Sequence, residues 1–243
     1  GRRKPRTENR MPTLHHRRWP VLLLLAVLAA PSGVGGQALG SLEDPFAPPG
    51  LGSGPYAEMS ALLEVTIFNI DVLTLEVRVP PDVGRRLGTL VQGHEYSEEL
   101  ADSVAAVILA SDDLWARQVF HRNVGIGRLV GGMRESSEKA AEAGYISQEY
   151  YEEFSANLPI WFAFLEEDGA RDGDEIVFRI QGDQVRTLYR TVDQRVLLDQ
   201  SGVDPEARRG SIPSFFAPGS RFRKRLVEAL VEGAPAPVQA EPS

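Results

Sequence analysis

Residues 173–200 read GDEIVFRIQGDQVRTLYRTVDQRVLLDQ, and this stretch decides the fold class. Three short runs rich in Ile, Val, Leu, Phe and Tyr lie at Glu175–Gln181, Gln184–Arg190 and Gln194–Asp199. Turn-forming residues separate them at Gly182-Asp183 and at Val192-Asp193. Such runs, joined by short turns, predict an antiparallel meander of three strands.

The sequence on either side of the meander supplies further strands and several helices. Two strands are predicted at Leu62–Phe68 and Asp71–Val79, the second because apolar residues alternate along it until Pro80-Pro81. Leu114–His121 fits either state, and its Val and Phe favour a strand. Helical spacing or capping predicts helices at Ser97–Ala110, Ile126–Ala143, Ser147–Leu165 and Ser220–Val231, with a loop at 204–210 and a helical turn at Ser211–Phe216. This order predicts an α+β fold, with a mostly antiparallel sheet covered on one face by helices.

The two ends of the chain differ in composition from its middle. Residues 1–38 look like a leader in which Met11 is the start, and the apolar run Val21–Ala30 precedes a cleavage site after Ala38. We expect a Pro/Gly-rich linker at 39–55, a single domain at 56–232 and a disordered tail at 233–243. The protein is therefore expected to be exported, periplasmic or secreted, without a stable membrane anchor after signal removal, because this run is too short to span a bilayer.

Charge and cysteine content exclude several functional classes. Lys and Arg number 26 against 34 Asp and Glu, and residues 1–38 hold seven of the basic but only one of the acidic residues. A body this acidic argues against nucleic acid as a partner. The absence of cysteine excludes disulfides and thiolate metal sites, and two histidines, His94 and His121, form no metal signature. We expect no metal and no cofactor.

Four stretches give the chain a resemblance to the chalcone isomerase-like superfamily. They are IFNIDVLTL (67–75), ASDDLWARQVFHRNV (110–124), GDEIVF (173–178) and SFFAPGS (214–220) with the helix that follows it. The order of these pieces, over roughly 62–230, carries the resemblance more than any single motif does. It implies an open-faced β-sandwich, with helices over one face of a large sheet and a ligand cleft between them. With the leader, it implies an exported bacterial member.

Plant members of that superfamily cyclise chalcones, and there a strand arginine stabilises the phenolate while Tyr and Thr hydroxyls hold a water. In this chain residues 51–77 contain no Arg or Lys, and the position expected for the arginine falls near Tyr56–Glu58. The Tyr and Asn expected near Met133–Ala141 are also missing. No catalytic residue can be carried over, so the resemblance implies a non-catalytic member, in which Arg78 or Arg134 is a substitute cation at most.

An aromatic stripe supplies the candidate binding site. Tyr and Phe side chains, with one Trp, recur at helical spacing over 150–165. Such a stripe is mainly core, but beneath a helix-covered sheet it would also form the wall of an apolar cleft. The candidate ligand-binding residues are Arg78, Arg134, Tyr151, Phe154, Trp161 and Phe162. The basic cluster Arg221–Arg225 is interpreted as a solvated helix face.

Two functions remain open at this point. The first is an exported, non-enzymatic protein that binds a small apolar or amphipathic molecule such as a fatty acid, as some relatives in the superfamily do. The alternative is an isomerase, an intramolecular lyase, that uses a relocated arginine. A domain that binds only a protein partner is the third and plainest possibility.

Overall fold

The computed structural model describes residues 51–52, 56–65 and 70–233. All of them belong to one structural unit, which runs from Ser41 to Ser243. The predicted leader, most of the predicted linker and nearly all of the predicted tail lie outside the described residues, so those expectations stay predictions.

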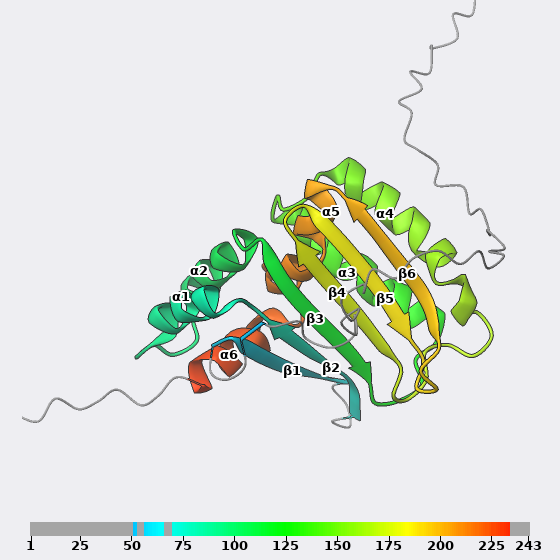
Figure 1. Ribbon diagram of the computed structural model, residues 1–243, viewed down its shortest axis with the longest axis horizontal. Coiled ribbons are helices and arrows are strands. Elements are labelled where there is room, and N and C mark those ends of the chain that lie inside the picture. Colours follow the sequence, from blue (N-terminus) through cyan, green and yellow to red (C-terminus); the bar gives the residue numbers. More distant parts are fainter. Residues whose placement is uncertain (1–50, 53–55, 66–69, 234–243) are drawn as a thin grey trace, which may run out of the picture. The chain divides into compact units, whose positions relative to one another are not determined.

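One six-stranded sheet organises the chain. Its strands follow one another in sequence order and every neighbouring pair is antiparallel, as Figure 1 shows. The strands are β1 (Glu58–Val65), β2 (Ile70–Arg78), β3 (Asp113–Phe120), β4 (Glu175–Gln181), β5 (Gln184–Arg190) and β6 (Val196–Val203). Strands β4 to β6 are the predicted meander. Strands β1 and β6 are the two edge strands of the sheet.

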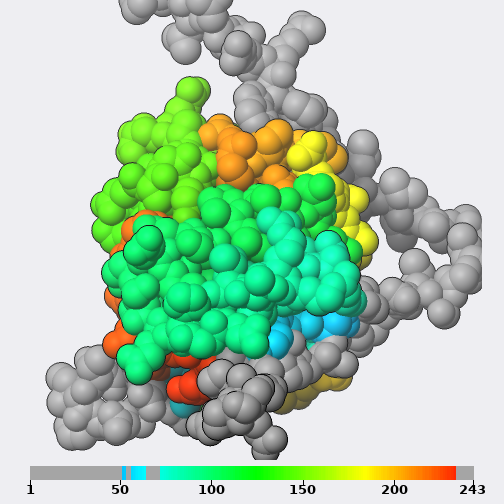
Figure 2. All heavy atoms as spheres, turned by 90° about the vertical axis from the view of Figure 1, so that its left-hand side faces the viewer, coloured from blue at the N-terminus to red at the C-terminus, as the bar shows by residue number. Residues whose placement is uncertain are grey.

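Helices occupy the long connections between β2, β3 and β4 and the end of the chain. They are α1 (Pro81–Val91), α2 (Glu98–Leu109), α3 (Ile126–Glu142), α4 (Gln148–Trp161), α5 (Pro205–Gly210) and α6 (Arg223–Glu232), with the 3-10 turns η1 (Ala163–Leu165) and η2 (Ile212–Phe216). In Figure 1 the α3 and α5 ribbons lie behind the sheet, and Figure 2 shows α1 and α2 side by side on the face turned toward the viewer.

The two faces of the sheet have different partners. Side chains alternate between faces along a strand. Leu75, Val77 and Ala116 belong to the main core, which the buried residues of the helices complete. Their neighbours Glu76 and Arg117 lie opposite each other on the other face, which we call the open face. The predicted α+β class, with a mostly antiparallel sheet and helices on one side, is confirmed.

Helix α1 was not predicted, because Pro80-Pro81 was interpreted only as the end of a strand. Pro81 occupies the first turn of the helix, where its missing N–H and fixed φ are tolerated. The helix contains Gly84 and Gly88, which disfavour helix in a sequence. A Cβ on Gly88 would lie 2.9 Å from the ring of Tyr56. The glycines therefore let α1 pack closely against the residues that lead into β1.

Strand β1 begins at Glu58, four residues before the predicted start at Leu62, and α4 ends at Trp161 instead of Leu165. Two other segments also differ from the prediction. The segment interpreted as a loop at 204–210 is α5, because the Asp204 carboxylate caps it by accepting hydrogen bonds from the N–H groups of Glu206 (2.7 Å) and Ala207 (3.3 Å). The third strand of the meander begins at Val196 instead of Gln194, whose φ of 65° is left-handed and belongs to the turn. Asp204 followed by proline is a helix-start signal, so the sequence did indicate α5.

Candidate functional site

Helix α4 presents the aromatic stripe, and it is only loosely built into the core. The Ser147 Oγ caps its first turn by accepting from the N–H of Tyr150 at 3.1 Å. Of the fourteen residues of α4 only Leu158 is buried. Phe154 and Trp161 pack against the main core but remain partly exposed, and Ile160 is 70% exposed. An apolar helix face that is only half covered is the feature that an apolar ligand would complete.

The aromatic rings fall into two groups. The Phe154 and Trp161 rings meet edge to face with centroids 5.5 Å apart, and Tyr150 stacks on Phe154 at 6.2 Å. Phe162 is buried and instead meets Phe164 at 5.9 Å. The structure therefore brings Phe154 and Trp161 together and directs Phe162 into the core. Tyr151 is half-buried on the same helix.

Arg134 reaches α4 from α3, and a proline explains its position. Pro159 has no N–H, so the carbonyl of Ser155, one turn earlier, loses its helical partner. The Nε and Nη2 of Arg134 donate to that carbonyl at 3.2 and 3.0 Å. Within the described part of the chain no ion pair joins Arg134 to a carboxylate. The guanidinium is thus held at the backbone of α4 by a neutral carbonyl.

Arg78 lies on the other side of the sheet. Its register partner is Trp115, on the open face, and its guanidinium carbon is 6.0 Å from that ring. Two carboxylates neutralise it, Glu76 at 2.6 Å and Glu58 at 3.4 Å. Arg78 therefore does not share a site with Arg134 or with the α4 rings, and the two predicted cations are not brought together.

The basic cluster on α6 is not a uniformly solvated face, so this prediction was wrong for Arg223. That residue is 3% exposed and binds two acids of α2, with Nη2 2.6 Å from Asp102 and Nε 3.2 Å from Glu98. Its Nη1 donates to the carbonyl of Phe216 at 2.8 Å. Burial by itself would lower the pKa of Arg223, but the hydrogen bond and charge of Asp102 raise it overall. This buried guanidinium fastens α6 to α2 and η2 and is already neutralised.

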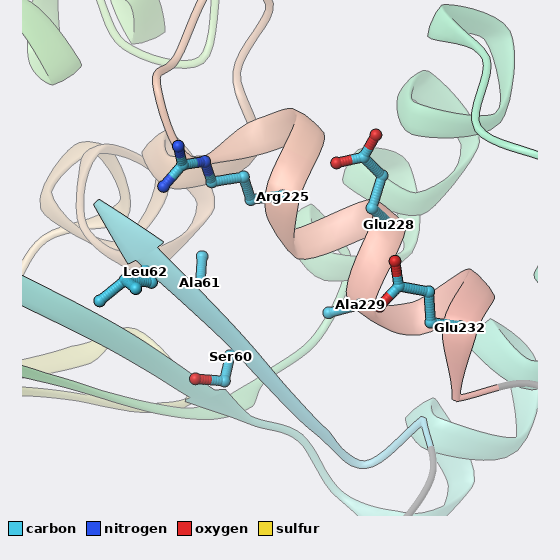
Figure 3. Close-up of a pocket in the computed structure, with 7 residues that line it drawn as sticks. All are labelled: Ser60, Ala61, Leu62, Arg225, Glu228, Ala229 and Glu232. Carbon is cyan, nitrogen blue, oxygen red and sulfur yellow. The ribbon is translucent and has the colours of Figure 1, made fainter. Parts of the chain in front are cut away.

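A polar groove separates α6 from the edge strand β1, and Figure 3 shows the helix running beside the strand. The groove has a volume of about 230 Å³, and its lining includes Ser60, Ala61 and Leu62 of β1 and Arg225, Glu228 and Glu232 of α6. This volume is below the range of about 300–1,000 Å³ that is usual for small-molecule sites, and acids outnumber bases in its lining. The groove is therefore a weaker candidate for an anionic ligand than α4.

A buried carboxylate at the start of β4 was also missed in the sequence. Asp174 is 1% exposed, and its Oδ2 accepts from the hydroxyl of Tyr189 at 2.6 Å and from the N–H of Arg171 at 2.8 Å. Its Oδ1 accepts from the N–H of Val192 at 2.7 Å. Burial, followed by the bond to Asp174, raises the pKa of Tyr189. With three donors satisfied, Asp174 fixes the turns around β4 and β5.

Comparison with known proteins gives a loose likeness in structure and none in sequence. No family model matches the chain, and no curated protein matches its sequence. The Arabidopsis thaliana fatty-acid binding protein AtFAP1 superposes with a TM-score of 0.41 at 13% identity, covering 72% of this chain and 87% of that protein. Membership of the chalcone isomerase-like superfamily stays a prediction.

Two features are absent from the described residues. These residues contain no group of three His, Asp or Glu side chains placed to hold a metal ion. In the same residues no helix is both long and apolar enough to cross a membrane.

Proposed function

We propose that this protein is a non-enzymatic carrier of a small amphipathic molecule with an anionic head, such as a fatty acid. The observation that supports this most is the bond from Arg134 of α3 to the Ser155 carbonyl of α4, the helix that carries the partly exposed Phe154 and Trp161 rings. In the described residues no carboxylate forms an ion pair with Arg134. The head would bind Arg134 and the apolar tail would lie along the rings.

The tail site follows from how little α4 is held. A helix with a single buried side chain and an internal proline is among the elements that open most easily, since few apolar contacts must be given up. Tilting α4 would open space beneath Phe154 and Trp161, which pack against the main core. An acyl chain entering there would replace water on those rings and gain about 0.8 kcal/mol for each buried CH₂.

The head site follows from electrostatics. Arg78 and Arg223 hold carboxylates, so an incoming anion would have to displace an ion pair at either place. At Arg134 the present partner is a neutral carbonyl, and a guanidinium offers further N–H donors to a carboxylate. A carboxylate therefore adds a charge-assisted bond at Arg134 without breaking one.

Fluorescence titration tests the proposal directly. The purified full-length chain is titrated with a fluorescent fatty acid, and a plain fatty acid and the alcohol of equal length then compete for the site. Arg134→Gln is expected to weaken the acid about tenfold while leaving the alcohol nearly unchanged, because a lost charge-assisted bond is worth about 1.4 kcal/mol or more. Trp161→Ala is expected to weaken both.

Arg78→Gln is the matched control, because it removes an arginine from the open face. Equal losses in Arg78→Gln and Arg134→Gln would contradict the head assignment. A protein that binds neither acid nor alcohol, and that carries no lipid in native mass spectrometry, would contradict the function itself. Incubating the same preparations with a 2′-hydroxychalcone and following its absorbance tests the isomerase alternative, for which acceleration lost in an arginine variant would be the positive result.

We also propose that the protein is exported, with support from the sequence alone. The support is the basic stretch, the apolar run Val21–Ala30 and the small residues before Leu39. Amino-terminal sequencing of the mature protein, recovered from the periplasm or medium of a bacterial culture, is expected to begin at Leu39. Recovery of the chain in the cytosol with its leader intact would contradict export.

A further inference from the structure

Strand β6 leaves one edge of the sheet without a partner strand. Among the described residues β5 is the only strand that pairs with it, and Figure 1 shows β6 as the outermost strand. Seven of its eight residues are exposed, and Leu198 is the exception. The opposite edge differs, because α6 runs beside β1 there (Figure 3). Of the two edges, β6 is therefore the one that another strand can reach.

The sequence of β6, VLLDQSGV, lacks the residues that usually keep exposed edges apart. Proteins commonly protect such an edge with lysine, proline or an unpaired charge. Within β6 the only charged residue is Asp199, and Arg186 of β5 donates two hydrogen bonds to its carboxylate, at 2.8 and 2.7 Å. Val196 and Val203, at the two ends of the strand, are 52% and 77% exposed. The edge is therefore apolar at its ends, and its one charge is already paired.

The hydrogen-bond pattern shows which backbone groups of β6 a further strand could bind. The N–H of Asp204 donates to the carbonyl of Asp183 at 3.2 Å, so these opposed residues form a bonded pair. Along an antiparallel ladder, bonded pairs alternate with pairs that are not bonded. Counting back from Asp204, the N–H and C=O groups of Asp199, Ser201 and Val203 point away from β5. These groups are the ones available at the edge.

We propose that β6 pairs antiparallel with β6 of a second copy of the chain, around a two-fold axis at Gln200. Outward-pointing groups must oppose outward-pointing groups, so the axis passes through a residue and not between two. With the axis at Gln200, Asp199 faces Ser201 of the partner subunit and exchanges backbone hydrogen bonds with it. An axis at Asp199 would instead set two aspartates against each other, and like charges directly opposite destabilise a sheet.

The ends of the strand and the symmetry both favour a second copy as the occupant. In the proposed register Leu197, which has no register partner on β5, faces Val203 of the partner subunit, so apolar side chains meet at either end. Two-fold pairing uses the same strand on both sides, so it closes after two copies. Eight residues a side are fewer than the about 20–30 of a standard interface, so we expect a dimer that dissociates on dilution.

Sedimentation of the full-length chain, from micromolar to millimolar concentration, tests the inference. A monomer that converts to a dimer as the concentration rises is expected. Gln200→Lys and Gln200→Glu each set two like charges across the axis, and each should raise the dissociation constant about fivefold. An equimolar mixture of the two variants should associate at least as tightly as the natural chain. Gln92→Lys, the same change at the exposed end of α1, is the matched control and should change nothing.

The absence of native cysteine lets cross-linking test the register. Across an antiparallel pair that is not hydrogen-bonded, the Cα atoms lie about 4.5 Å apart, which a disulfide can span. Gln200→Cys is therefore expected to form a disulfide-linked dimer on mild oxidation. Ser201→Cys is the control, because its two copies would lie two residues apart along the paired strands, beyond the limit of about 7 Å.

A chain that stays monomeric up to millimolar concentration would overturn the inference. A dimer that neither charged variant at Gln200 weakens would also overturn it, because its interface would lie elsewhere on the molecule. Equal cross-linking of Gln200→Cys and Ser201→Cys would contradict the proposed register. Far-UV circular dichroism of each variant checks the fold, and both positions are exposed. None of these results depends on a ligand at Arg134, so the inference can fail or hold independently of the proposed function.

Discussion

Replacing Arg223 with methionine tests how α6 is held to the rest of the fold. The guanidinium is 3% exposed and donates to four acceptors: the carboxylates of Asp102 and Glu98 and the carbonyls of Glu98 and Phe216. Methionine is close in length and fills most of the space, so the change isolates the polar contacts from packing.

The expected loss lies near the low end of the range for a broken buried pair, which is about 3–5 kcal/mol. The carboxylates of Glu98 and Asp102 have side chains 74% and 66% exposed, so they regain water once the arginine is removed. The Phe216 carbonyl, which accepts in a buried bond, regains none, and an unsatisfied buried acceptor costs about 1–3 kcal/mol. We therefore expect Arg223→Met to lower the free energy of unfolding by about 3 kcal/mol.

Urea unfolding, followed by circular dichroism, measures this loss, and Asp102→Asn is the matched control. The control is expected to cost about 1 kcal/mol or less, because it removes an exposed charge and leaves the arginine bonded to both carbonyls. If Asp102→Asn costs as much as Arg223→Met, the ion pair and not the buried carbonyl carries the energy, and the reasoning fails. A loss below about 0.5 kcal/mol in Arg223→Met would refute it as well.

Three further predictions concern the polar contacts described above. Arg134→Ala is expected to lower the free energy of unfolding by about 1 kcal/mol in the natural chain but by close to nothing after Pro159→Ala, because alanine returns an N–H to the Ser155 carbonyl. Urea unfolding of the four proteins in this double-mutant cycle measures the coupling, and additive losses would contradict the prediction. Asp174→Asn is expected to cost about 2–3 kcal/mol by the same assay, because an amide cannot accept from all three donors; a loss no larger than that of a surface Asp→Asn change would contradict it. The raised pKa of Tyr189 stabilises the fold fully below the ordinary tyrosine value of about 10, and this contribution is lost as the pH rises toward the folded pKa. Above pH 10, the free energy of unfolding should therefore fall less steeply with pH in Tyr189→Phe than in the natural chain. Parallel plots of this free energy against pH would contradict the prediction.

The sheet was largely predictable because local signals agree with one another there. Strands β4 and β5 begin and end where the apolar runs do, at Glu175–Gln181 and Gln184–Arg190. Gly182 takes a φ of 59° in the turn between them, a conformation that the sequence signals by its glycine. Where composition, periodicity and turn chemistry coincide, tertiary contacts have little left to decide.

Helix α1 was not predicted for the opposite reason, since its local signals conflict with its packing. Gly84 and Gly88 weaken the helix locally, yet they are the residues that allow Ala57 and Tyr56 to approach it. Such a close approach depends on residues that are distant in sequence, so no local pattern shows it. The sequence of α5 did carry its signal, in Asp204-Pro205, and that helix was missed through interpretation alone.

The placement of Arg78 could have been predicted from the strand itself. The alternation over Asp71–Val79 separates Leu75 and Val77 from Glu76 and Arg78, so an apolar inner face already directs this arginine outward. The role of Arg134 could not be found in this way. It depends on α3 lying against the one carbonyl of α4 that Pro159 leaves without a partner.

These three arginines differ in what they can offer a ligand, although their side chains are the same. At about 4 Å, near a protein surface, two opposite charges attract by about 4 kcal/mol before the cost of removing water is counted. Arg78 and Arg223 already form ion pairs with carboxylates of the chain, so an anion that approaches either would gain little and would be repelled by those acids. Arg134 is bound to a carbonyl dipole, and its monopole charge is left for an incoming anion. The partner that each guanidinium holds, and not the number of arginines in the chain, therefore determines what it could offer to the anionic head that we propose.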